Sequence, residues 1–145
     1  MKNKIIIYTD GGSRGNPGQA AIGVVIEDGS GHDKKYGEKI GVKTNNEAEY
    51  EAVVFALKKV KQIFGKEKTK QMEIEMRMDS QLVARQLGGE YRIEEERLFP
   101  LFIKIWNLKF DFGKIVFKHI PRERNREADR MLNEALDQSA QSRLL

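Results

Sequence analysis

The segment from Ile5 to Gly18 constrains the fold of this chain more than any other. Its first four residues, Ile5 to Tyr8, are apolar and rich in β-branched side chains, a pattern typical of a strand buried on both faces, and this strand is expected to end at Thr9. Asp10 follows at once, and a glycine-rich loop is expected from Gly11 to Gly18. Asp10 is therefore predicted where a central strand leaves the sheet. An unpaired charge is costly there, so a metal ion or a basic group is expected beside it; an aspartate that caps a turn is the alternative.

The remaining pattern predicts a mixed five-stranded α/β sheet flanked by helices. Short connections join the first three strands into an antiparallel meander. The two later strands follow helices, and strand–helix–strand crossovers place neighbouring strands parallel. The expected strands are 5–9, 19–27, 34–42, 73–78 and 114–120. The expected helices are 44–64, with Thr44 and Glu47 as a capping box, then 81–87, 94–110 and a last helix capped by Asn125. The single tryptophan, Trp106, is expected in the core.

Four acidic residues stand at the junctions of these elements. Asp10 and Asp79 each follow a strand, Asp129 begins the last helix, and Glu49 continues the inward stripe of the first helix. For Glu49 the alternative is a boundary residue favoured by the helix dipole. Ligands of such sheets bind beyond the carboxyl ends of the strands, where Asp10 and Asp79 would meet.

Composition limits how these carboxylates can be used. The chain has no cysteine, which excludes disulfides, thiol catalysis and cysteine-bound metal. Carboxylates that share a small site raise one another's pKa unless positive charge joins them. Oxygen ligands favour Mg²⁺, with Mn²⁺ as a substitute, and two such ions can act together on a phosphodiester.

Length and charge fit a single domain over residues 1–137, followed by a tail over 138–145 that is expected to fray. The chain has 145 residues and a formal net charge of +4, which permits a polyanionic partner without requiring one. No segment reads as a membrane span or a signal peptide. A cytoplasmic monomer is the expectation from these observations.

Several motifs together closely resemble type 1 ribonuclease H. They run in the order of that family: the stretch from Tyr8 to Gly18, the stretch from Thr44 to Glu49, Met78-Asp79-Ser80, His119, and the stretch from Asn125 to Asp129. The resemblance covers nearly the whole chain. It implies an endonuclease that cuts the RNA strand of RNA–DNA hybrids with two Mg²⁺ ions and leaves a 5′-phosphate and a 3′-hydroxyl.

The resemblance also implies roles for individual residues. Asp10, Glu49, Asp79 and Asp129 match the metal-binding carboxylates, and His119 matches a histidine linked to proton transfer and product release; a structural histidine is the alternative. The expected substrate contacts comprise a glycine pair, polar residues matching the family, and three arginines. They are Gly11, Gly12, Arg14, Asn16, Thr44, Asn45, Arg122 and Arg124.

The chain departs from some members of that family between residues 90 and 96. Where they carry a lysine-rich protrusion, it has a short segment that includes Glu94, Glu95 and Glu96. This trait resembles a compact branch, some members of which also act on double-stranded RNA. Three other functions are alternatives: a nucleic-acid binder that does not cut, a nucleotide-phosphate enzyme, and a DNA-directed nuclease. The four carboxylates oppose the first, and the glycine loop lacks the Gly-Lys-[Ser/Thr] of a P-loop. Asn45, Asn46 and the glycines favour RNA over DNA.

Overall fold

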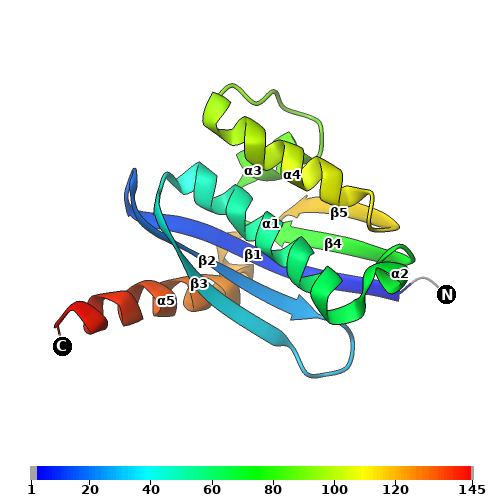
Figure 1. Ribbon diagram of the computed structural model, residues 1–145, viewed down its shortest axis with the longest axis horizontal. Helices are drawn as coiled ribbons and strands as arrows, with labels where there is room; N and C mark the ends of the chain where they lie inside the picture. The colour runs from blue at the N-terminus through cyan, green and yellow to red at the C-terminus, as the bar shows by residue number, and fades with distance from the viewer. Residues whose placement is uncertain (1–2, 145) are drawn as a thin grey trace.

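A five-stranded mixed sheet organises the molecule (Figure 1). The computed structural model describes residues 3–144. The strand order is β3-β2-β1-β4-β5, with β1, β2 and β3 antiparallel and with β4 and β5 parallel to β1. The strands are β1 (Asn3–Gly15), β2 (Gly18–Glu27), β3 (Lys34–Lys43), β4 (Met72–Met78) and β5 (Lys114–His119). The predicted mixed sheet is confirmed.

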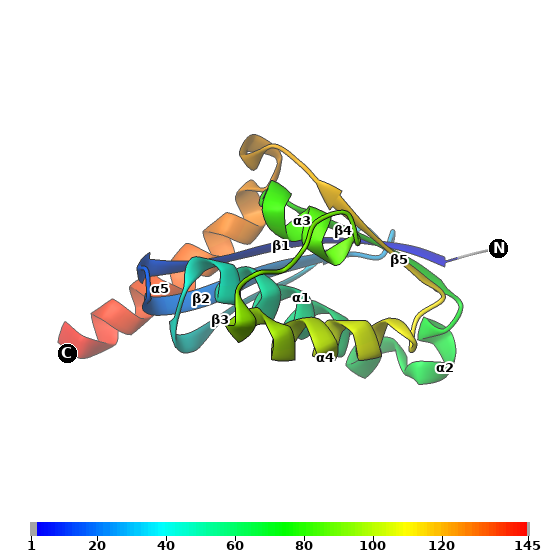
Figure 2. The ribbon, with the colours of Figure 1, turned by 90° about the horizontal axis from the view of Figure 1, so that it is seen from above.

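Helices cover the two faces of the sheet unequally. On one face α1 packs on β1 and β2, and α4 packs on α1, so that the two helices lie side by side in both ribbon views (Figure 2). The other face carries α5, which packs on β2 and β3. The helices are α1 (Asn45–Phe64), α2 (Lys66–Thr69), α3 (Gln81–Leu87), α4 (Phe99–Lys109) and α5 (Arg126–Leu144), with 3₁₀ turns at Glu96–Leu98 and Arg122–Arg124.

The main core lies between the sheet and α1. Alternate residues of β1 and β4, such as Ile7 and Met76, are fully buried there against Tyr50 and Leu57 of α1. A smaller apolar cluster joins β2 to α5 through Ala21, Leu132, Ala135 and Leu136. Both faces of the sheet are therefore fastened to a helix that contributes a predicted carboxylate.

The first strand is longer than predicted, and this corrects the expected position of Asp10. Instead of ending at Thr9, β1 runs on to Gly15 and pairs with β2 up to the pair Gly15–Gly18. Asp10 thus lies inside the strand opposite Gly23, while the parallel pairing with β4 stops at Thr9. Glycines weaken the pattern by which a strand is predicted, yet their backbones pair normally in a hairpin.

Three glycines allow helices to approach the sheet at backbone distance. A Cβ added to Gly23 would collide with the carbonyl oxygen of Ala128 in α5, and one added to Gly37 would collide with the carbonyl oxygen of Met131. A Cβ on Gly11 would collide with the Ala48 carbonyl of α1. The helices that carry Glu49 and Asp129 are therefore seated directly on strand backbone.

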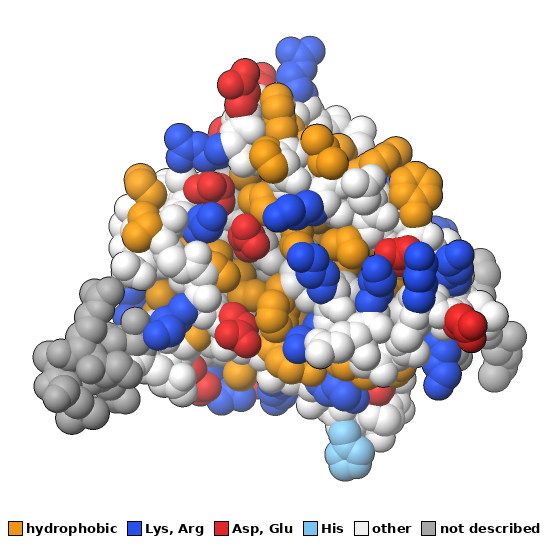
Figure 3. Space-filling view, in the orientation of Figure 1, with side chains coloured by type: hydrophobic (Ala, Val, Ile, Leu, Met, Phe, Trp, Pro, Cys, Tyr) orange, Lys and Arg blue, Asp and Glu red, His pale blue; other side chains and the backbone are white. Residues whose placement is uncertain are grey.

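The helix predicted over 94–110 is broken, and Trp106 is not in the core. A 3₁₀ turn precedes α4, and Pro100 occupies the first turn of the helix, where its missing N–H costs little. Leu101 and Ile105 face the core, whereas Trp106 is 50% exposed. Figure 3 shows hydrophobic side chains along the course of α4 on this face. The apolar pattern predicted a helix in this region, but neither its start at Phe99 nor which face is buried.

The short helix α2 follows α1 after Gly65. Residues 138–144 of the segment that is expected to fray are the last part of α5, which ends at Leu144. The division at residue 137 stays a prediction. Over residues 3–144, the helices are too short or too polar for any of them to cross a membrane.

Candidate active site

Three acidic side chains converge at the end of β4. Asp10 belongs to β1, Glu49 to α1, and Asp79 directly follows β4. One carboxylate oxygen from each lies within 4.8 Å of the others. Oxygens at such distances can share a cation, because hard divalent ions take oxygen ligands from several carboxylates.

Strand register and a helix cap bring these groups together. Thr9 pairs with Met78, so Asp10 and Asp79 are the next residues along two parallel neighbours. The first turn of α1 is fixed by the predicted capping box: the Thr44 hydroxyl accepts from the Glu47 N–H at 3.1 Å, and the Glu47 carboxylate accepts from the Thr44 N–H at 2.9 Å. Glu49 follows this fixed turn by two residues.

Because the cluster is buried, it is costly for its carboxylates to be ionised without a cation beside them. Loss of hydration, together with the nearby Asp79 and Asp129 carboxylates, raises the pKa of Asp10 to about 8. Burial, followed by the charges of Asp10 and Asp79, raises the pKa of Glu49 well above its ordinary value. A hydrogen bond from the Gly11 backbone N–H opposes both shifts. Within the described residues, the buried Oε2 of Glu49 has no hydrogen-bond partner. An orphaned oxygen among crowded carboxylates fits a divalent cation.

Asp129 completes the group from the opposite face of the sheet. It lies in the first turn of α5 and lines the same cavity of about 410 Å³ as Asp10, Glu49 and Asp79. All four predicted carboxylates thus border one cavity. Five of the predicted substrate contacts also line it: Gly11, Gly12, Arg14, Asn45 and Arg122.

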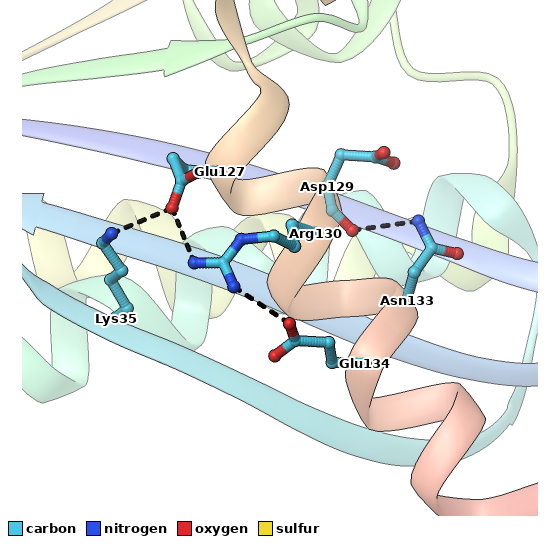
Figure 4. Close-up of polar contacts among 6 residues, drawn as sticks. All are labelled: Lys35, Glu127, Asp129, Arg130, Asn133 and Glu134. Atoms are coloured by element: carbon cyan, nitrogen blue, oxygen red, sulfur yellow. Dashed lines mark hydrogen bonds and ion pairs between the residues drawn. The ribbon is translucent and has the colours of Figure 1, made fainter.

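A network of ion pairs on α5 lies beside this cavity but does not enter it (Figure 4). Glu127 accepts from Lys35 of β3 at 2.9 Å and from Arg130 at 2.8 Å, and Arg130 also reaches Glu134. These hydrogen bonds, that of Arg130 first, lower the pKa of Glu127. Figure 4 shows the Asp129 carboxylate directed away from these groups. Because these ion pairs are exposed, they add little to the free energy of folding, but the Lys35–Glu127 pair connects α5 to β3.

The other predicted site residues lie outside the cavity lining. Asn16 and Thr44 contact residues next to the lining: the Asn16 Oδ1 accepts from the Asn45 N–H at 3.0 Å, and Thr44 caps α1. Arg124 lines a separate hollow, with Tyr8 and Glu27. The structure therefore does not join Arg124 to the carboxylates.

His119 is also apart from the carboxylate cavity. It ends β5, in register with Met78, and lines a groove between α3 and β5. Although it shares strand parity with the partly buried Ile115 and Phe117, its side chain is exposed. It is therefore not a buried core histidine.

Asn125 is a site residue that the sequence pattern did not reveal. We expected it to cap the last helix, but its Nδ2 donates to the Thr9 carbonyl at 2.9 Å and to Asp79 Oδ2 at 3.1 Å. The side chain is 1% exposed, and its Oδ1 has no partner among the described residues. Asn125 thus ties Asp79 to β1. Only its place just before the α5 carboxylate could have suggested this contact.

Comparison with known proteins places this arrangement in a family. The reverse transcriptase-like family model matches residues 8–135. The structure of LC11-RNase H1, isolated from compost by a metagenomic approach, shares 48% identity and a TM-score of 0.87, over 95% of this chain and 99% of that one. The chain belongs to the ribonuclease H1 family. RNase H1 of Halobacterium salinarum is similarly related, at 38% identity and a TM-score of 0.84, over 93% of this chain and 98% of that chain.

One relative is much longer. The bifunctional protein Rv2228c of Mycobacterium tuberculosis is 36% identical over 96% of this chain, but the chain spans only 37% of its length. The solved N-terminal RNase H domain of that protein matches with a TM-score of 0.84 at 35% identity, over 96% of this chain and 97% of that chain. The ribonuclease H1 chain described here thus corresponds to one part of that relative.

Proposed function

We propose that this chain is an endonuclease that hydrolyses the RNA strand of RNA–DNA hybrids and leaves 5′-phosphate and 3′-hydroxyl ends. The observation that carries the proposal is the cluster of Asp10, Glu49 and Asp79, whose oxygens lie within 4.8 Å of one another on the wall of an open cavity. The 48%-identical LC11-RNase H1 has been crystallised with an RNA/DNA hybrid, which supports this substrate class.

Asp10, Glu49, Asp79 and Asp129 would hold the divalent cations, Mg²⁺ by preference and Mn²⁺ as a substitute. When bound, two such ions supply activation of a water and stabilisation of the leaving oxygen. The residues themselves set the geometry: β1 and β4 present two carboxylates in register, and Asn125 holds Asp79 by its Oδ2. Crowded carboxylates repel one another, so a bound cation would stabilise their charged forms.

The substrate would lie across the cavity mouth. Arg14 and Arg122 bring the positive charge that phosphates need beside an acidic site. Asn45 is fixed by contacts from both ends, because its N–H donates to Asn16 and its Oδ1 accepts from the Ser13 N–H at 2.9 Å. An amide held in this way next to Gly12 can form a hydrogen bond with a ribose 2′-hydroxyl. This hydroxyl is the group by which proteins distinguish RNA from DNA.

His119 would assist proton transfer as product leaves. His119 of β5 pairs with Met78 of β4, and Met78 directly precedes Asp79 in the sequence. A group at this position acts on a step that the carboxylates already make possible, so it speeds turnover without being required. Arg124 would contact phosphates of the substrate beyond the cavity.

A cleavage assay tests the proposal directly. Labelled RNA–DNA hybrid, duplex RNA and duplex DNA are incubated with the protein plus Mg²⁺, Mn²⁺ or a chelator, and the product ends are mapped. We expect metal-dependent cuts in the RNA of the hybrid, with duplex RNA as a slower second substrate. Binding of hybrid without cleavage under all metal conditions would instead make the protein a binder. Sedimentation of the active species tests the expected monomer, and fractionation of cells tests the cytoplasmic location.

A further inference from the structure

The outward face of α4 is apolar, and it takes no part in the carboxylate site described above. Four large side chains at spacings of four, three and four residues form this α4 outer face: Phe99, Ile103, Trp106 and Phe110. They are 43%, 56%, 50% and 68% exposed, although Leu101 and Ile105 on the inner face are buried. A helix with large apolar residues on two opposite sides is normally covered on both of them. Exposed apolar surface of this kind marks interaction sites.

The surface is also hollowed at the end of the helix. A depression of about 450 Å³ lies between α4 and the start of β5. Apolar groups of Trp106, Phe110, Phe112 and Ile115 line it, together with Lys109 and Lys114. A hollow with apolar walls next to a helix face is where a partner's anchoring side chain buries most effectively.

The charged residues of α4 itself are all lysines. No acidic residue occurs from Arg97 to Phe110, while Lys104 and Lys109 belong to α4 and Lys114 follows it. Within residues 3–144 none of these lysines has an ion-pair partner, and the nearby Asp111 is bound by Lys61 at 2.6 Å and Lys66 at 3.5 Å. A complementary partner is therefore acidic. A second copy of this chain would bring lysines against lysines.

The aromatic rings are arranged for a protein partner rather than for nucleobases. Phe102 stacks on Trp106 with ring centres 6.4 Å apart, and Lys109 Nζ lies 5.1 Å from the centre of the same ring. Phe110 meets the indole at a steep angle. Sequence-tolerant binding of single strands needs free ring faces on which bases stack. Here the indole is already occupied by neighbours of its own helix.

We propose that the α4 outer face docks an acidic amphipathic helix of a partner protein. The partner's apolar residues would lie along Ile103 and Trp106, with one large side chain in the hollow. Its carboxylates would meet Lys104, Lys109 and Lys114. This is the helix-in-groove mode of recognition. The surface is separate from the carboxylate cavity, so docking leaves that cavity open.

The single tryptophan provides a direct test. A synthetic helical peptide with Leu and Phe at four–three–four spacing, and with Glu elsewhere, is titrated into the full chain while Trp106 fluorescence is followed. Two control peptides have the same composition in scrambled order, or Lys in place of Glu. We expect a blue shift that saturates at micromolar peptide, and at least tenfold weaker binding of either control.

Variants then locate the contact. Binding is measured by calorimetry for Ile103→Glu and for Lys104→Glu/Lys109→Glu, with Val42→Glu as a matched control because Val42 is 61% exposed on a distant strand. The α4 variants should lose at least tenfold in affinity and keep hybrid cleavage and melting temperature, whereas the control binds normally. Equal binding of the scrambled peptide, equal affinity of the α4 variants, or no saturation at millimolar peptide would refute the proposal. A preference for single-stranded oligonucleotide, or self-association on sedimentation, would refute it as well.

Discussion

Replacement of Gly11 by alanine tests how the site is assembled. An alanine Cβ there would lie against the carbonyl carbon and oxygen of Ala48 and the N–H of Glu49, all backbone atoms of α1. Ordinary contact begins at 3.4 Å, so either β1 or the start of α1 must move by roughly 1 Å. Gly12 differs: its Cβ would meet Leu132 Cδ1 at 3.6 Å, an ordinary contact. The two neighbours therefore form a matched pair.

The magnitudes follow from packing. Overfilling a packed interior costs about 1–3 kcal/mol, and Gly11→Ala should fall at the upper end because backbone cannot turn aside. Gly12→Ala should change the free energy of unfolding by about 0.5 kcal/mol or less. The shift at Gly11 also displaces Glu49, and a 1 Å misplacement can reduce a rate about 10²-fold.

Urea unfolding, followed by circular dichroism, gives the stability of both variants, and calorimetry with Mg²⁺ gives their metal affinity. Single-turnover cleavage of hybrid then shows whether a stability loss is accompanied by a loss of rate. A rise in KM alone for Gly12→Ala would indicate close approach of substrate to that backbone. The reasoning is refuted if Gly11→Ala unfolds at the same urea concentration as Gly12→Ala.

Four further outcomes are expected. Asp10→Asn should abolish hybrid cleavage in Mg²⁺, while its melting temperature without metal holds or rises because a crowded charge is removed. Without divalent ions, stability of the native chain should fall as pH rises from about 4 to about 8: the folded state keeps a proton on Asp10 that the unfolded state has lost, and urea unfolding at several pH values with chelator checks this. Asn125→Ala should lower the cleavage rate and Mg²⁺ affinity, measured by single-turnover kinetics and calorimetry, because Asp79 loses a hydrogen bond worth about 1–3 kcal/mol to a charged acceptor. His119→Ala should slow steady-state turnover by about 10²–10⁴-fold while Mg²⁺ binding persists; an unchanged rate would remove His119 from the reaction.

The sheet topology was predictable because local patterns and connection rules agreed. Alternation in 73–78 identified β4, and the capping box at Thr44 fixed the start of α1. The convergence of Asp10 and Asp79 followed from the parallel strands that carry them. These are inferences from local sequence and from chain connectivity, which a single sequence contains.

Features that depend on tertiary contacts were not predictable. The continuation of β1 through its glycines requires the partner β2, whose pairing no local pattern reports. The exposure of Trp106 depends on which side of α4 meets α1. Large apolar residues occur on two opposite sides of this helix, so the sequence pattern does not single out the buried side. The hydrogen bond from Asn125 to Asp79 joins residues 46 apart in sequence. Each of these features depends on contacts with residues that are distant in the sequence.

The glycines beneath α5 have a consequence for how the site responds to change. At Gly23 and Gly37 the strand backbone meets helix backbone directly, with no side chain between them whose rotamer could alter the spacing. The reach from Asp10 to Asp129 is therefore set by peptide geometry, which is stiff, rather than by side-chain packing, which adjusts. Substitutions on the exposed side of α5 can accumulate without changing this reach. A single added methyl group beneath the helix would change it at once.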